Sequence, residues 1–173
     1  TASGGTGTLN YLWSNNATTT SITALASGSY MLTVTDANGC INSSIQVITE
    51  PTQLGISVLS IDSANCYGAS DGSIEVSSTG GVLPYAYSWN NSTSNALNTG
   101  LSAGVYAVTV TDANGCDTSL SASVAQPDSI SISITGTDLL CNNDNSGSAA
   151  ATASGGTGTL NYLWSNNATT TSI

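Results

Sequence analysis

The sequence contains no lysine, arginine, histidine or phenylalanine among its 173 residues, yet it carries ten aspartate and glutamate residues. Without side-chain cations the protein has no counter-charge for nucleic-acid phosphates, so we expect no binding to DNA or RNA. It also lacks the basic segment that docks proteins on anionic membranes. Enzymes that need a histidine base, a lysine Schiff base or an arginine phosphate clamp are excluded too, and we predict a non-enzyme that requires no cofactor.

Long apolar runs are missing as well, so we expect no direct insertion into a membrane. Charged residues make up 6 % of the chain and apolar residues 39 %, which leaves a largely uncharged polar sequence. Disordered acidic chains usually lack aromatic and β-branched residues. Here Trp, Tyr, Val and Ile alternate with polar neighbours. The composition therefore predicts an all-β, secreted, repetitive protein.

Two levels of internal repetition organise the sequence. The segment 1–22 recurs letter for letter at 152–173, an offset of 151 residues. Inside that period, TVTDANGC at 33–40 returns at 109–116, and Cys66 is followed 75 residues later by Cys141. The repeat is therefore about 75 residues long, and two variants of it alternate. We predict the C-terminal part of one repeat at 1–51, a complete repeat at 52–127 and the N-terminal part of the next at 128–173.

The complete repeat has the pattern of short strands separated by turns. Apolar residues alternate with polar ones around Ile74 and Val76, and again from Tyr106 to Val110. A period of two with frequent turn signals predicts an antiparallel β-sandwich. The Asn-Gly pairs at 38–39 and 114–115 predict type I′ hairpin turns, because both central residues of that turn need positive φ. Asp36 and Asp112, which precede these pairs, are expected to cap the turns through their carboxylates.

One aromatic cluster recurs in each repeat. Its placement is typical of an immunoglobulin-like sandwich, which buries a tryptophan on the third strand and begins its penultimate strand with a tyrosine. We therefore predict core positions for five aromatic residues: Trp13, Tyr30, Trp89, Tyr106 and Trp164. The alternative is a platform of exposed rings that stack on sugars, as in a carbohydrate-binding module. A buried cluster is the preferred interpretation, because aromatic side chains dominate the core energetics of small domains.

The order of these motifs resembles the SprB repeat of Bacteroidetes cell-surface adhesins. The matching segments are 23–40, 70–91, 99–116 and 142–173, which together span most of the sequence. Along a repeat, the motifs Cys, Gly-Ser, Gly-Gly, Tyr-x-Trp and a terminal TVTDANGC occur in a fixed order. The sequence departs from the family in its complete lack of Lys and Arg. In one variant, Leu163 stands between the two aromatics where the other has Ser88.

The resemblance implies a very large secreted protein at the bacterial cell surface, built from tandem immunoglobulin-like repeats arranged as a rod or filament. Its role would be that of a structural, adhesive extracellular fibre or stalk, and some family members act in gliding motility. The partners implied are neighbouring repeats, other copies of the protein, and extracellular surfaces or polysaccharide. The alternative function is an array of carbohydrate-binding modules on an adhesin.

Export would make disulfide bonds between the four cysteines plausible. The preferred pairing is Cys66 with Cys116 inside the complete repeat, with Cys40 and Cys141 pairing outside residues 1–173. The alternative follows from immunoglobulin-like topology, which places the two cysteines of a repeat at opposite ends, too far apart to bond. Each bond would then join adjacent repeats.

Two further sites remain as expectations. Asn142, Asp144 and Ser146 alternate before a glycine, as the ligands of a calcium loop do, although a polar turn explains the same residues. The family resemblance also makes Ser63 and Ser129 candidates for O-glycosylation, because each follows an aspartate and precedes an apolar residue.

Overall fold

The structure is a computed structural model that describes residues 2–173. It divides into two compact units, Thr1–Thr52 and Gln53–Ile173. Within the described residues it contains strands and no helix, so no helix is available to cross a membrane. The strands are β1 (Asn10–Trp13), β2 (Gly28–Thr35), β3 (Ile41–Ile48), β4 (Gly55–Asp62), β5 (Gly72–Thr79), β6 (Ala86–Trp89), β7 (Leu97–Leu101), β8 (Gly104–Thr111), β9 (Asp117–Val124), β10 (Ser131–Thr137) and β11 (Ser148–Ser154).

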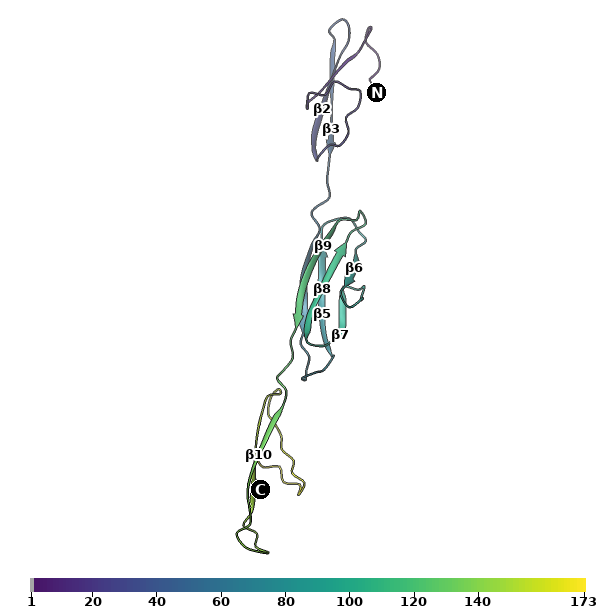
Figure 1. Cartoon of the computed structure of the whole chain (residues 1–173). Helices are drawn as coiled ribbons and strands as arrows, with labels where there is room; N and C mark the ends of the chain where they lie inside the picture. The colour runs from purple at the N-terminus through teal and green to yellow at the C-terminus, as the bar shows by residue number, and fades with distance from the viewer. Residues whose placement is uncertain (1) are drawn as a thin grey trace. The chain divides into compact units, whose positions relative to one another are not determined.

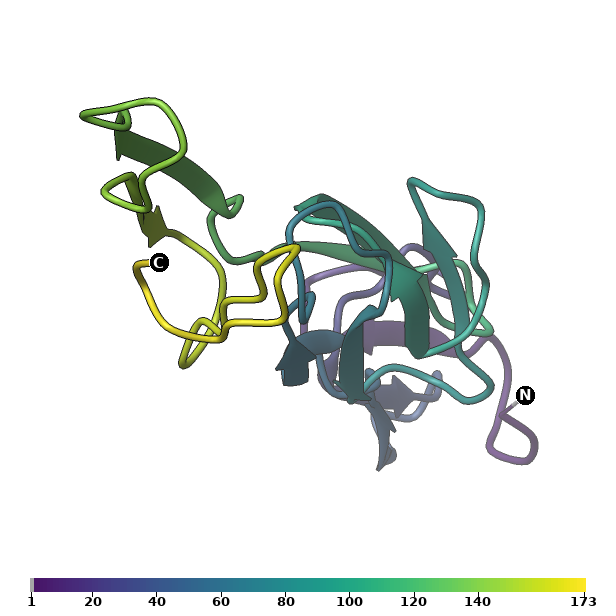
Figure 2. The same cartoon turned by 90° about the horizontal axis from the view of Figure 1, so that it is seen from below.

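The complete repeat is a sandwich of two three-stranded antiparallel sheets, with strand orders β4-β5-β7 and β6-β8-β9. These strands lie next to one another in both views of the molecule (Figures 1 and 2). Alternate residues of each sheet point into one shared core, because successive side chains of a strand face opposite ways. That core consists of Ile74, Val76, Trp89, Leu101, Val108 and Val124. The predicted fold class, an all-β sandwich repeat, is confirmed.

The described residues of the first unit contain one antiparallel sheet of order β1-β2-β3. Its pairing repeats that of β6-β8-β9: Trp13 lies opposite Leu32, as Trp89 lies opposite Val108. Strands β10 and β11 pair in the same way as β4 and β5. The β4–β5 ladder is interrupted by a bulge between Val58 and Ser60, which the β10–β11 ladder lacks. The three parts thus follow one plan, and the two variants differ by a local insertion.

The predicted type I′ turns are wrong. Only the glycine of each Asn-Gly pair has positive φ, at 83° for both Gly39 and Gly115. The N–H of Gly115 donates to the carbonyl of Asp112 at 3.0 Å, and the N–H of Asp112 donates to the carbonyl of Cys116 at 2.9 Å. The connection is therefore a three-residue hairpin loop in which a turn is followed by a left-handed glycine. Asn114 has no need of positive φ in such a loop.

Substitution of Gly72 by alanine should destabilise the complete repeat. A Cβ at this position would lie 2.6 Å from Val124 Cγ1 and 3.0 Å from the carbonyl oxygen of Leu101. Because backbone cannot move aside as a flexible side chain can, we expect a loss of about 1–3 kcal/mol. Gly104→Ala is the matched control, since the nearest atom to its Cβ would be 3.9 Å away. Urea unfolding followed by circular dichroism tests the pair, and equal midpoints would contradict the prediction.

Candidate functional site

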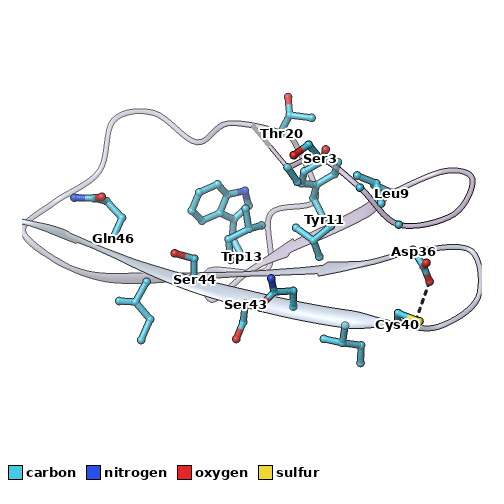
Figure 3. Close-up of a pocket in the computed structure, with 18 residues that line it drawn as sticks. Ser3, Leu9, Tyr11, Trp13, Thr20, Asp36, Cys40, Ser43, Ser44 and Gln46 are labelled. Atoms are coloured by element: carbon cyan, nitrogen blue, oxygen red, sulfur yellow. Dashed lines mark hydrogen bonds between the residues drawn. The ribbon is translucent and has the colours of Figure 1, made fainter.

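One hollow of the first unit lies over the inner face of the β1-β2-β3 sheet (Figure 3). It has a volume of about 780 Å³, and Tyr11, Trp13, Leu32 and Val34 line it. In the complete repeat the same sheet positions are occupied by Tyr87, Trp89, Val108 and Val110. There the last three are between 0 and 3 % exposed, because the β4-β5-β7 sheet covers them. The hollow is therefore a sandwich interior without its second sheet, and we do not interpret it as a ligand site.

The recurring tryptophans have a structural use. The indole N–H of Trp89 donates to the carbonyl of Asn95 at 2.8 Å, and the ring is 3 % exposed. Trp13 and Trp164 make the same bond to the carbonyl six residues later, at 2.9 and 2.8 Å. A buried indole needs such an acceptor. Since the ring of Trp89 is enclosed and its N–H is satisfied internally, it offers no face for stacking on a sugar.

The two predicted corner tyrosines also bond to their own loops. Tyr30 donates its hydroxyl hydrogen to the carbonyl of Ala26 at 3.1 Å, and Tyr106 donates to the carbonyl of Ser102 at 3.0 Å. Both rings are half-buried. A tyrosine hydroxyl that bonds a few residues upstream is the arrangement of the tyrosine corner in immunoglobulin-like sandwiches.

The carboxylates of Asp36 and Asp112 each accept three backbone hydrogen bonds at equivalent positions of two repeats. Asp112 is 6 % exposed and accepts hydrogen bonds from the backbone N–H groups of Val82, Asn114 and Cys116, each at 2.9 Å. Asp36 accepts the equivalent three bonds, the longest-range of them from Thr6 at 2.9 Å. Turn capping accounts for two bonds of each set. The third fastens the hairpin to a loop 30 residues earlier, which the sequence pattern did not indicate.

These bonds lower the pKa of both aspartates below the ordinary value of 3.8, mainly through Thr6 for Asp36 and through Val82 for Asp112. Asp71 and Asp144 are shifted in the same direction by bonds from Asn65 and Ser146. A carboxylate whose pKa is lower in the folded chain than in the unfolded chain stabilises the fold. This contribution is fully present at pH values above the pKa of the unfolded chain. That stability is lost as pH falls through the folded pKa.

The stability of the protein should therefore be flat from about pH 5 to 7 and fall below about pH 4, because the chain has no histidine and these aspartates are ionised in both the folded and the unfolded state above about pH 5. Urea midpoints measured at pH 3, 4, 5, 6 and 7 test this expectation. The Asp112→Asn variant should show a shallower decline on the acid side. A midpoint that rises steadily from pH 7 to 3 would instead show that repulsion among the ten carboxylates dominates.

The four cysteines are exposed and unpaired in the structure. Cys66 lies near the C-terminal end of β9, because the N–H of Ala64 donates to the carbonyl of Ala125 at 2.9 Å. Cys116 immediately precedes the first residue of β9. The eight residues of β9 separate the two thiols by roughly 25 Å. A disulfide requires Cα atoms no more than about 7 Å apart, so this separation argues against the preferred Cys66–Cys116 pairing and favours the alternative, bonds between adjacent repeats.

The predicted calcium loop is held together by its own side chains. Asp144 accepts bonds from the backbone N–H of Cys141 at 2.8 Å and from the hydroxyl of Ser146 at 2.8 Å. The hydroxyl of Ser146 in turn accepts from the N–H of Leu140 at 2.8 Å. Among the described residues, no three Cys, Asp or Glu side chains gather as metal ligands. The turn explains the motif without a cation, and calcium binding through Asn142, Asp144 and Ser146 stays a prediction.

The two candidate glycosylation sites, Ser63 and Ser129, are both exposed. Exposure is required for modification and is common among serines, so glycosylation also stays a prediction.

The sandwich with its buried tryptophan, its aspartate-fastened hairpin and its recurrence along the chain defines a tandem β-sandwich repeat protein. The family model of the SprB repeat matches the chain at two places, residues 59–94 and 133–169. The chain therefore contains SprB-repeat sequence at these two places, and the resemblance noted in its motifs is confirmed. SprB repeats are typical of surface adhesin-like repeat regions. A comparison with curated proteins gave no match.

Proposed function

We propose that this chain is part of the shaft of a secreted cell-surface adhesin, in which the repeats serve as structural spacers. The observation that carries the proposal is the way the complete repeat uses its distinctive residues. Trp89 is enclosed in the core, and the carboxylate of Asp112 is occupied by backbone N–H groups. These recurring residues therefore build the fold. Neither Trp89 nor Asp112 has a free face or a free carboxylate available to a small ligand.

The surface supports an extracellular fibre. It carries no lysine or arginine, so trypsin-like proteases find no cleavage site. Repeat arrays extend in one dimension when each unit contacts only its neighbours. The partners we propose are neighbouring repeats, other copies of the protein, and extracellular polysaccharide bound weakly at many points.

The length of purified arrays tests the proposal. Chains containing one, two and four of the 151-residue periods should show a maximum dimension in small-angle X-ray scattering that grows in proportion to the number of periods. A maximum dimension that stops growing between two and four periods would mean that the repeats fold back on one another, and the shaft would be rejected.

The alternative, a carbohydrate-binding array, now depends on aromatic residues outside the core. Tyr67 is 61 % exposed and is the most exposed aromatic ring of the complete repeat. If polysaccharide bound saturably to the wild-type array and not to the Tyr67→Ala array, the repeats would be binding modules. Absence of saturable binding, together with growth in length, is the result expected of spacers.

A further inference from the structure

The cysteines of the complete repeat mark its two ends. We call the end that contains Ala64, Gly68 and Gln126 the Cys66 end, and the end that contains Leu54, Gly81 and Asp112 the Cys116 end. The N–H of Gly68, two residues after Cys66, donates to Oε1 of Gln126 at 2.8 Å. The N–H of Cys116 itself donates to Asp112. Each thiol is therefore exposed on a loop that is fastened to its own end of the sandwich.

The chain passes through the repeat from one end to the other. It begins at the Cys116 end, where a Cβ on Gly81 would lie 3.1 Å from Leu54 Cδ1 and 2.8 Å from Oδ2 of Asp112. It leaves at the Cys66 end, where Ala125 and Gln126 are bonded to Ala64 and Gly68. Any repeat built this way presents an early cysteine where the chain leaves and a late cysteine where the chain begins.

The link to the following repeat is very short. Gln126 belongs to the Cys66 end of the complete repeat, whereas the carbonyl of Asp128 already accepts the N–H of Gly156 at 2.8 Å. Gly156 is the counterpart of Gly81, and a Cβ on it would lie 3.0 Å from the side chain of Ile130. Only Pro127 separates the two fastened residues, so their Cα atoms are at most about 7.6 Å apart. The end that carries the early cysteine is thus tethered directly to the end of the next repeat that carries the late cysteine.

We propose that the early cysteine of each repeat forms a disulfide with the late cysteine of the repeat that follows it. With two alternating variants, the partner of Cys66 is a copy of Cys40, and the partner of Cys141 is a copy of Cys116. Cys40 and Cys116 of the present chain pair with early cysteines of the repeats that precede theirs. All four partners lie outside residues 1–173, which agrees with four exposed, unpaired thiols.

The bond forms by thiol–disulfide exchange with an external disulfide, the oxidant of this step. The thiolate of Cys66 attacks that disulfide and expels one thiol. The late thiolate of the next repeat then attacks the mixed disulfide and expels the second. The two protein thiols lose two electrons and two protons, and the external disulfide gains them as two free thiols.

An extended chain tests the pairing independently of any adhesive role. Because residues 152–173 repeat residues 1–22, adding residues 23–51 after Ile173 completes the third repeat and supplies a second copy of Cys40. The extended chain is folded in a glutathione redox buffer, its free thiols are alkylated, and it is cut before aspartate, because trypsin has no site. Mass spectrometry should find one linked pair of peptides, Cys66 with the added copy of Cys40, lighter by the two hydrogens lost. Cys40, Cys116 and Cys141 should be alkylated.

Two substitutions control the result. Cys66→Ser should abolish the linked pair, and Cys116→Ser should leave it unchanged. The chain without the added residues should contain no linked pair at all. A bond from Cys141 to the added copy of Cys40, a bond from Cys66 to Cys116, or five alkylated thiols in a chain with the circular dichroism of folded β-sheet would each overturn the proposal.

Discussion

Replacement of Trp89 by alanine is expected to remove most of the stability of the complete repeat. The ring is 3 % exposed, packs with Ile74, Val108 and Leu101, and bonds through its indole N–H to Asn95. Removing a buried tryptophan side chain costs about 3–5 kcal/mol. A domain of this size is held together by roughly 4–11 kcal/mol in total. Urea unfolding measured by circular dichroism should show a large fall in the midpoint, and hydrogen exchange in β8 should accelerate.

The same chain contains the control. Trp13 occupies the equivalent strand position and makes the equivalent indole bond, but it lines the open hollow instead of a closed core. Trp13→Ala should therefore leave the unfolding of the complete repeat unchanged. If both substitutions lowered the midpoint of that repeat equally, the loss could not be attributed to the closed core around Trp89.

Replacement of Asp112 by alanine should lower the unfolding temperature of the complete repeat by more than about 5 °C. Three backbone N–H groups lose their acceptor at once, and bonds to a charged acceptor are the stronger kind. The bond from Val82 matters most, because it joins the β8–β9 hairpin to the loop after β5. Scanning calorimetry at pH 7 gives the measurement.

Two further substitutions separate the loss of hydrogen-bond acceptors from the loss of a negative charge. Asp117→Ala removes an exposed carboxylate five residues away at the first position of β9, and it should change the unfolding temperature little. Asp112→Asn keeps one acceptor oxygen and loses the other, so its effect should lie between those of wild type and alanine. An Asp112→Ala protein that unfolds at the wild-type temperature would contradict the prediction, because water would then replace the carboxylate with no loss of stability.

The sandwich was predictable from the sequence because its strands alternate with a period of two. Ile74 and Val76, which alternate with Glu75, are 0 and 3 % exposed, whereas Glu75 lies on the outer face. Recurrence gave the length of the repeat, because repeated segments fix the length of a unit without reference to its fold. The family followed from the order of motifs.

Features that could not be predicted from the sequence depend on contacts between residues that belong to different strands and loops. Asn98 is fully buried, and its amide exchanges two hydrogen bonds of 3.1 Å with the amide of Asn91. No periodic pattern marks such a pair, because a polar residue in a strand is normally expected on the outer face. The third bond of Asp112 and the separation of Cys66 from Cys116 have the same origin. Both are set by which loops meet at each end of the sandwich, and local sequence does not record that.

The path of the chain through the complete repeat has a mechanical consequence. The chain begins in β4 at one end and leaves from β9 at the other, and these strands belong to different sheets. A pull on the two termini drags β4 along β5 and β9 along β8, parallel to the strands and perpendicular to their ladder hydrogen bonds. Such a load strains the bonds of a ladder together, as in shear, whereas a pull from one end would open them one after another. We therefore expect a single repeat to yield under tension at a high force and in one step.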